Sequence, residues 1–227
     1  RTWGAGYYLE LLPATVARLD PTVPYWPGSP WSGRDDLHPN DPAHGTTHIW
    51  DVWNTDDYTR YRDYVPRFVA EFGYQAPPAY ATLRRALRDE PLAPDSPGMA
   101  HHQKAVDGDL KLRRGLDAHL PTPRDFDDWH YLTQLNQARA LSLGIEHFRS
   151  LRPLCMGTIM WQLNDCWPVT SWAAVDGDGR PAVVPHAVAQ PLQGGRLALA
   201  GVHQGAVHGD VAGGHALGVR RGIHLRL

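Results

Sequence analysis

The feature that most constrains the fold is the apolar segment at residues 154–163, which reads LCMGTIMWQL and contains no charged side chain. A strand of a parallel sheet is buried on both faces, so its sequence is continuously apolar rather than alternating. Residues 125–151 precede this segment. Their apolar positions recur at three- and four-residue steps, and Asp125 is placed to cap them. Together the two segments predict a long helix followed by a parallel strand.

Three further strand-like segments lie at about residues 24–27, 47–53 and 67–72. Short apolar strands that alternate with helices are typical of βα units, in which the strands run parallel. Four such units make half of an eight-stranded barrel. The other helices are expected at residues 6–19, 57–66, 79–88 and about 106–119, and residues 31–46 read as a long surface loop.

The tail, residues 181–227, differs from the rest in composition. It has no Trp, Tyr, Phe or Lys, and its only acidic residue is Asp210. Such a segment cannot bury enough apolar surface to offset its ordering entropy, so we expect it to be irregular and to pack no core. Its five histidines match no metal-binding spacing. We expect no metal and no other cofactor.

Charge and hydropathy exclude several partners. The net charge of −2 gives no basic footprint for a nucleic acid, and no apolar run is long enough to span a membrane. The chain opens without an apolar signal segment, which favours a cytoplasmic location. Cys155 and Cys166 are expected to be two reduced, buried thiols rather than a disulfide framework.

Residues 67–75 carry the strongest candidate for chemistry. They read RFVAEFGYQ and place Glu71 at the end of an apolar strand, where an unused carboxylate is costly to bury. The residues alone leave two interpretations open: a structural acid paired with Arg67 or another neighbour, or a catalytic carboxylate. The nine tryptophans, all between Trp3 and Trp172, favour carbohydrate binding, because indole rings stack on sugar faces.

The segment AEFGYQ at residues 70–75 resembles the nucleophile segment of glycoside hydrolase family 2, and its Tyr-Gln extension is similar to the β-mannosidase branch. Four more segments occur in the same order in β-mannosidases: YWPGSPWSG, THIWDVWN, SPGMAHHQKA and MGTIMWQLNDCWPVTSW. The resemblance covers about residues 1–180. It implies that residues 1–180 form the C-terminal half of a (β/α)8 TIM barrel, strands 5–8. It also implies a retaining exo-glycosidase acting on terminal non-reducing β-D-mannosides, with Glu71 as its nucleophile.

The resemblance also assigns the substrate-binding residues. Trp161 would floor the subsite for the terminal sugar, and Asn164 would either orient sugar hydroxyls or cap a turn. His48 and Trp50 share one face of their strand, and the indole N–H of Trp50 would reach the nucleophile. Trp172 is expected to be packing. His101 and its neighbour are expected on a solvated loop at the mouth of the barrel.

Retaining hydrolysis needs a second carboxyl group, which in this family ends strand four in an Asn-Glu pair. No Asn-Glu dipeptide occurs in the chain. We therefore expect the acid/base residue, with strands 1–4, to precede Arg1. The partner of this chain would be that N-terminal half, its substrate a β-mannoside oligosaccharide or glycan, and the isolated fragment would be inactive.

The resemblance ends near residue 180, where the family continues with Lys-Pro-Leu-Trp-Tyr-Ala. The segment Ala-Val-Val-Pro at residues 182–185 can be encoded GCC GTG GTA CCC, which gives Pro-Trp-Tyr when read one base later. Residues 181–227 are therefore either a disordered natural tail or a frameshifted one. Three alternatives also stay open for the function: another family 2 exo-β-glycosidase, a non-catalytic sugar-binding remnant, and an incomplete gene product with no activity of its own.

Overall fold

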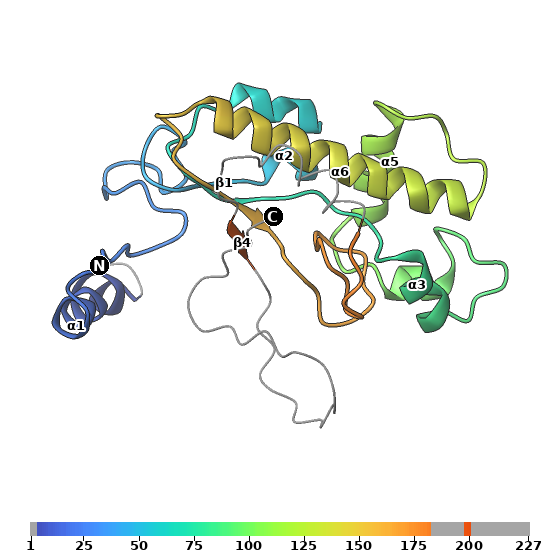
Figure 1. The fold of residues 1–227 in the computed structure, drawn as a ribbon, viewed down its shortest axis with the longest axis horizontal. Helices are drawn as coiled ribbons and strands as arrows, with labels where there is room; N and C mark the ends of the chain where they lie inside the picture. Colours follow the sequence, from blue (N-terminus) through green and yellow to red (C-terminus); the bar gives the residue numbers. More distant parts are fainter. Residues whose placement is uncertain (1–3, 183–197, 201–227) are drawn as a thin grey trace.

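A parallel sheet forms the centre of the molecule (Figure 1). The computed structural model describes residues 4–182 and the backbone of residues 198–200. The strands are β1 (Thr47–Ile49), β2 (Val69–Phe72), β3 (Thr158–Trp161) and β4 (Ala198–Ala200). They lie in the order β1-β2-β3-β4, and every neighbouring pair is parallel. The parallel α/β arrangement predicted from the apolar strands is therefore confirmed.

One predicted strand is wrong and one observed strand was not predicted. Residues 24–27 have no regular structure, because Pro24 and Pro27 lack the N–H groups that a sheet ladder requires. The additional strand is β4, inside the segment expected to be irregular, and its three residues are too few to show a period. The remaining tail, residues 183–197 and 201–227, lies outside the described residues.

The helices follow the predicted segments with local differences. The described helices are η1 (Tyr7–Leu11), α1 (Leu12–Leu19), α2 (Asp51–Asn54), η2 (Tyr58–Asp63), α3 (Tyr80–Ala86), α4 (Pro97–His101), α5 (Gly108–Asp117) and α6 (Phe126–Ser150). The segment at 57–66 is a 3₁₀-helix, and η1 is a π-helical turn that leads into α1. The predicted strand at 47–53 ends at Ile49 and turns into α2, where Trp53 has a φ of 88°.

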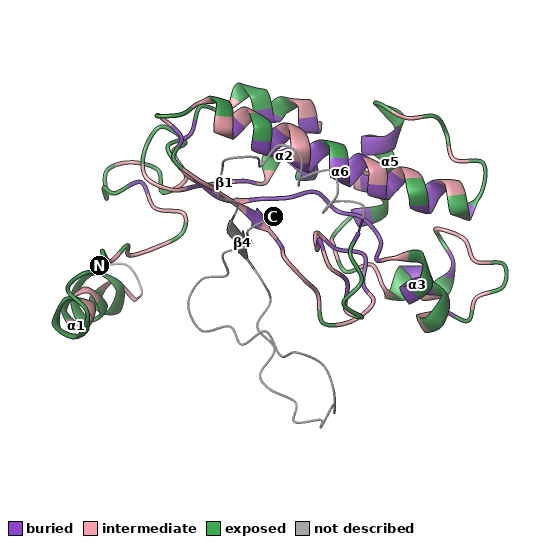
Figure 2. Ribbon diagram, viewed as in Figure 1, coloured by how far each residue is buried: buried purple, intermediate pink, exposed green. Residues whose placement is uncertain are grey.

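The long helix α6 lies along the sheet and packs against η2, α5 and β3 (Figure 2). Its first turn is capped by Asp125, whose side chain accepts from the Asp128 N–H at 2.8 Å. Phe72 of β2 meets Phe148 edge to face, with ring centroids 5.4 Å apart, and meets Tyr61 in the same way at 5.6 Å. All three rings are almost fully buried, and each contributes roughly 1.5–3 kcal/mol through burial.

The N-terminal helical segment, η1 and α1, is described without a single buried residue. Figure 1 shows it apart from the sheet. Several of its large apolar side chains are exposed, among them Tyr7 at 66% and Leu19 at 69%. In the described part of the chain no helix has the length and apolar content needed to cross a bilayer. Cys155 is buried as expected, but Cys166 is exposed because it lies on the polar loop after β3.

Candidate active site

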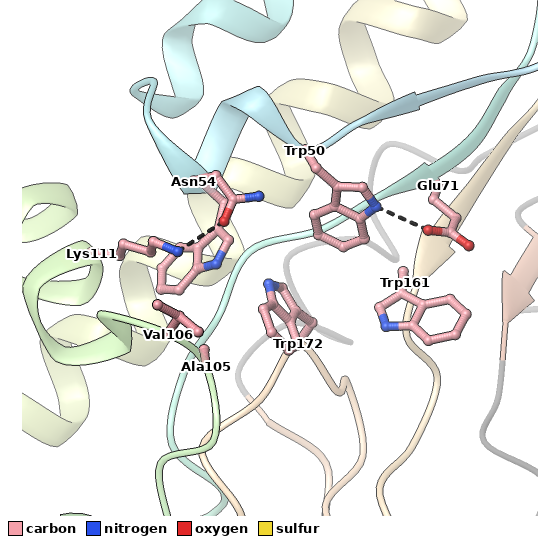
Figure 3. A pocket seen from close by; sticks show the side chains of 9 residues that line it. Trp50, Asn54, Glu71, Ala105, Val106, Lys111, Trp161 and Trp172 are labelled. Carbon is pink, nitrogen blue, oxygen red and sulfur yellow. Dashed lines mark hydrogen bonds between the residues drawn. The ribbon is translucent and has the colours of Figure 1, made fainter. Parts of the chain in front are cut away.

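The candidate site lies where the parallel strands end. Glu71 comes from β2, Trp161 is the last residue of β3, and Trp50 directly follows β1. Because the strands are parallel, their carboxyl ends meet at one edge of the sheet, which is where barrel enzymes place their sites. These residues border an open pocket of about 420 Å³ (Figure 3). Its lining comprises Trp50, Trp53, Asn54, Glu71, Ala105, Val106, Lys111, Trp161 and Trp172.

The side chains of Trp50 and His48 both lie next to one oxygen of Glu71. The indole N–H of Trp50 donates to Oε2 at 2.9 Å, so the hydrogen bond expected from the sequence is present. Nδ1 of His48 lies 3.2 Å from the same oxygen, and His48 is also the register partner of Glu71 between β1 and β2. The Glu71 side chain is 26% exposed, so the carboxylate reaches the pocket while its base is packed.

His48 is fixed by residues from the loop that precedes β1. The side chain of Asn40 accepts from the His48 backbone N–H at 2.6 Å and donates to its carbonyl at 2.8 Å. The hydroxyl of Ser29 lies 2.7 Å from Nε2. Burial lowers the pKa of His48, against the opposing charge of Glu71, so the imidazole is neutral at physiological pH. The hydroxyl of Ser29 donates to Nε2 in the tautomer that carries its proton on Nδ1, beside Oε2 of Glu71.

Gly73 allows the end of β2 to approach β3 closely. A Cβ atom at this position would collide with the backbone carbonyl oxygen of Trp161 and would lie 3.1 Å from the ring of Trp50. The hydroxyl of Tyr61 donates to the Gly73 carbonyl at 3.0 Å. A side chain at position 73 would therefore displace the two tryptophans that flank Glu71.

The segment after Glu71 is held by three buried side chains of α6, which we call the α6 ladder: His130, Gln134 and Gln137. Gln137 donates to the carbonyl of Tyr74 at 2.8 Å, Gln134 to Pro77 at 3.0 Å, and Nε2 of His130 lies 2.8 Å from the carbonyl oxygen of Pro78. The ladder residues are four and three positions apart, so they share one face of the helix.

The apolar face predicted for this helix is mostly buried: Trp129, Ala138, Leu141 and Ile145 are buried, and Leu132 and Leu135 are half-buried. The α6 ladder adds buried polar residues that the prediction did not include. The carbonyl groups after Glu71 need donors, and the polar side chains of α6 supply them. The spacing of apolar residues along α6 could not reveal these polar contacts. The two successive prolines, Pro77 and Pro78, do indicate that carbonyl groups in this segment lack the partners of a regular sheet.

Asn164 lies outside the pocket lining. Its amide donates to the carbonyl of Asp165 at 3.3 Å. The carboxylate of Asp165 accepts from Gln162 at 3.2 Å and from the hydroxyl of Ser171. These contacts organise the loop after β3.

The pocket contains residues that the sequence did not indicate. Trp172, expected to be packing, lines the pocket and meets Trp50 edge to face at a centroid distance of 5.9 Å. Asn54 and Lys111 also line it, and only the folded positions of α2 and α5 bring them there. His101 and the residue after it pack against Trp167 and do not line the pocket. Within the described ranges, no cluster of three or more His, Cys, Asp or Glu residues could hold a metal ion.

Comparison with known proteins relates the chain to one class of enzymes. No protein-family model matches it. Beta-mannosidase B of Aspergillus niger is 37% identical over 191 residues, or 82% of this chain and 22% of that protein. Beta-mannosidase B of Aspergillus flavus is 36% identical over 192 residues, with the same shares. These matches confirm the resemblance drawn from the motifs.

The structural comparison agrees. The crystal structure of the β-D-mannosidase from Dictyoglomus thermophilum matches with a TM-score of 0.79 and 38% identity. The match covers 83% of this chain and 23% of that one. The chain thus spans about a fifth of the length of the curated relatives, 22% of each.

Proposed function

We propose that this chain, a homologue of one segment of the β-mannosidases, carries the nucleophile part of a retaining exo-glycosidase site for terminal non-reducing β-D-mannosides. The observation that supports this most directly is the position of Glu71. It stands at the carboxyl end of a parallel strand, in a pocket lined by Trp161, with the indole N–H of Trp50 on one of its oxygens. In this proposal β1, β2 and β3 are successive strands of a (β/α)8 barrel.

In the proposed reaction a carboxylate oxygen of Glu71 attacks the anomeric carbon, and the bond to the leaving oxygen breaks. A mannosyl ester of Glu71 results, which water then hydrolyses. Trp161 would stack on the terminal sugar ring, and His48 and Trp50 would hold the carboxylate in its attacking orientation.

The leaving oxygen needs a proton from a second carboxyl group about 5–5.5 Å from the nucleophile. Among the residues that line the pocket, Glu71 is the one acid. We therefore place the proton donor in a part of the enzyme outside the described residues.

The test uses a substrate that needs no proton donor. The full 227-residue chain is incubated with 2-deoxy-2-fluoro-β-D-mannosyl fluoride, whose fluoride leaves unprotonated. The Glu71 carboxylate then forms an ester with C1, and the C1–F bond breaks. The fluorine at C2 slows hydrolysis of this ester, so the labelled peptide can be identified by mass spectrometry. We expect the label on Glu71 and none in a Glu71→Gln variant with the same near-ultraviolet circular dichroism.

A label on another carboxylate would refute the assignment of Glu71. The absence of a second acid from the pocket lining favours one alternative, a sugar-binding remnant. In that case the folded chain would bind the fluoride reversibly, seen as quenching of tryptophan fluorescence, and no peptide would be labelled.

A further inference from the structure

The pocket continues beyond Glu71 to a second, cationic end. Figure 3 shows Glu71 and Trp161 on one side, the rings of Trp50 and Trp172 between, and Asn54 and Lys111 on the far side. The ammonium group of Lys111 donates to Oδ1 of Asn54 at 2.9 Å. Lys111 and Asn54 have no role in the proposed attack of Glu71 on the sugar.

The helix α5 carries two cations near this end, of which Lys111 lines the pocket and Arg114 does not. Lys111 and Arg114 are three residues apart on one helix face, and Arg114 donates to the backbone carbonyl of Trp53 at 2.7 Å. Both cations are thus bonded to uncharged oxygen atoms. In the part of the chain that the structure describes, neither forms an ion pair with a carboxylate.

Donors remain available at this end of the pocket. An ammonium group has three N–H donors, and one of the three from Lys111 is used by Asn54. The amide nitrogen of Asn54 has no acceptor among the described residues. Charged hydrogen bonds to oxyanions are stronger than neutral ones, although the exposure of Asn54 and Val106 leaves this end of the pocket partly screened by water.

We propose that Lys111 and Asn54 form a binding site for an oxyanion group, such as a carboxylate or sulfate, on the leaving-group side of the substrate. The location of this site on the leaving-group side rests on the proposed function of Glu71, whereas the oxyanion site itself rests on the pocket and its charges. The substrate class is a β-mannoside whose aglycone carries an anionic substituent.

The affinity test compares two ligands that differ in charge: 4-carboxyphenyl β-D-mannoside and its neutral isostere, 4-carbamoylphenyl β-D-mannoside. Quenching of tryptophan fluorescence gives the dissociation constant of each for the full chain. We expect the carboxylate to bind about three- to tenfold more tightly, as for a partly exposed charged contact. Lys111→Met should remove this preference. Lys104→Met is the matched control, because Lys104 lies over the ring of Trp167 and not in the pocket, and it should keep the preference.

The chain contains only these two lysines, so a direct readout is available. Labelling with ¹³C-lysine leaves the ammonium groups unmodified and gives an ε-carbon NMR signal for each, assigned with Lys104→Arg. The Lys111 signal should shift with the carboxylate ligand and stay in place with the amide. The oxyanion site would be refuted if Lys111→Met kept the same preference for the carboxylate ligand. It would also be refuted if the Lys111 signal did not move when this ligand binds.

Two further measurements distinguish this proposal from the proposed function of Glu71. Glu71→Gln should lose the covalent label and yet retain the preference for the carboxylate ligand. Free benzoate, which has no sugar, should shift the Lys111 signal only at much higher concentration. If benzoate bound as tightly as the carboxyphenyl mannoside, the site would bind free anions and its assignment to the leaving group would be wrong.

Discussion

The two oxygens of the Glu71 carboxylate have different surroundings. Trp50 and His48 lie at 2.9 and 3.2 Å from Oε2. No described residue donates to Oε1, so this oxygen is the one free to attack a sugar. An oriented nucleophile gains rate because the bound geometry is already close to that of attack. Trp50 and His48 therefore hold one oxygen of Glu71, and the other oxygen remains free to react with the substrate.

A substitution of Trp50 tests the role of its N–H in holding Glu71. Trp50→Phe removes the N–H donor and keeps an aromatic ring, so it removes one charged hydrogen bond, worth roughly 1.5–3 kcal/mol. We expect labelling of Glu71 by the fluoride to slow by about 10- to 100-fold. Trp172→Phe is the control, since it also replaces a pocket indole but its N–H has no partner among the described residues. Equal slowing in both variants would show that ring size, not the hydrogen bond, controls the rate.

At the scale of elements, α6 links the core to the site. One part of its buried face packs Phe148 on Phe72, and the α6 ladder holds the segment that leaves β2. The segment that directly follows Glu71, from Phe72 to Pro78, is thus fixed by one helix. A site built on regular elements is positioned more precisely than one built on loops.

The packing of α6 against β2 is testable at Gly144. A Cβ atom there would lie 2.9 Å from the ring of Phe72 and 3.3 Å from that of Tyr61. Overpacking costs about 1–3 kcal/mol, which outweighs the gain of up to about 1 kcal/mol in helix propensity. We expect Gly144→Ala to lower the unfolding midpoint in urea. Gly6→Ala, where nothing lies within 4 Å, should not lower it.

The α6 ladder also predicts a pH dependence of stability. Burial lowers the pKa of His130, against the smaller opposing effects of the Pro78 carbonyl and Asp127. The unfolded chain then binds the proton more readily than the folded one. The contribution of His130 is complete above the unfolded pKa of about 6.5 and is lost as the pH falls through the lower folded value. His130→Gln keeps a donor for Pro78 and removes the titrating group.

Thermal unfolding at pH 7.5 and 5.5 measures this effect. The loss of stability at pH 5.5 should be smaller in His130→Gln than in the parent chain. His101→Gln, at an exposed position, serves as the control and should behave like the parent. An unchanged loss in His130→Gln would mean that other groups, such as His48, dominate the acid response.

The elements also show how far the sequence could lead. The parallel sheet and the end at which Glu71 and Trp161 lie follow from continuously apolar strands, which local sequence encodes directly. Residues 24–27 do not form the expected strand, because Pro24 and Pro27 have no backbone N–H to donate. Lys111 and Asn54 could not be found from the sequence, because they meet in the pocket only through the tertiary placement of α5 against α2.

At the scale of the whole molecule, the chain matches about a fifth of each β-mannosidase that resembles it. We propose that residues 1–180 are the second half of a barrel and that residues 181–227, which contain β4, are either a natural tail or a frameshifted one. The gene sequence tests the frameshift. A single-base shift near codon 180 should restore a Trp-Tyr pair, and its failure to do so would leave a natural tail.

The proposed location of the proton donor in another part of the enzyme predicts how activity depends on the leaving group. 2,4-Dinitrophenolate leaves without protonation, so the full chain should form the mannosyl ester from 2,4-dinitrophenyl β-D-mannoside. Methyl β-D-mannoside needs a general acid and should react slower by a further factor of roughly 10²–10⁴. Hydrolysis of the ester also needs a base. Azide needs none: it forms a bond to C1 as the ester to Glu71 breaks, and it should release β-mannosyl azide and speed turnover. If methyl β-D-mannoside were hydrolysed rapidly and azide had no effect, a carboxylate of this chain would be the acid/base, and the assignment of that role to another part of the enzyme would be wrong.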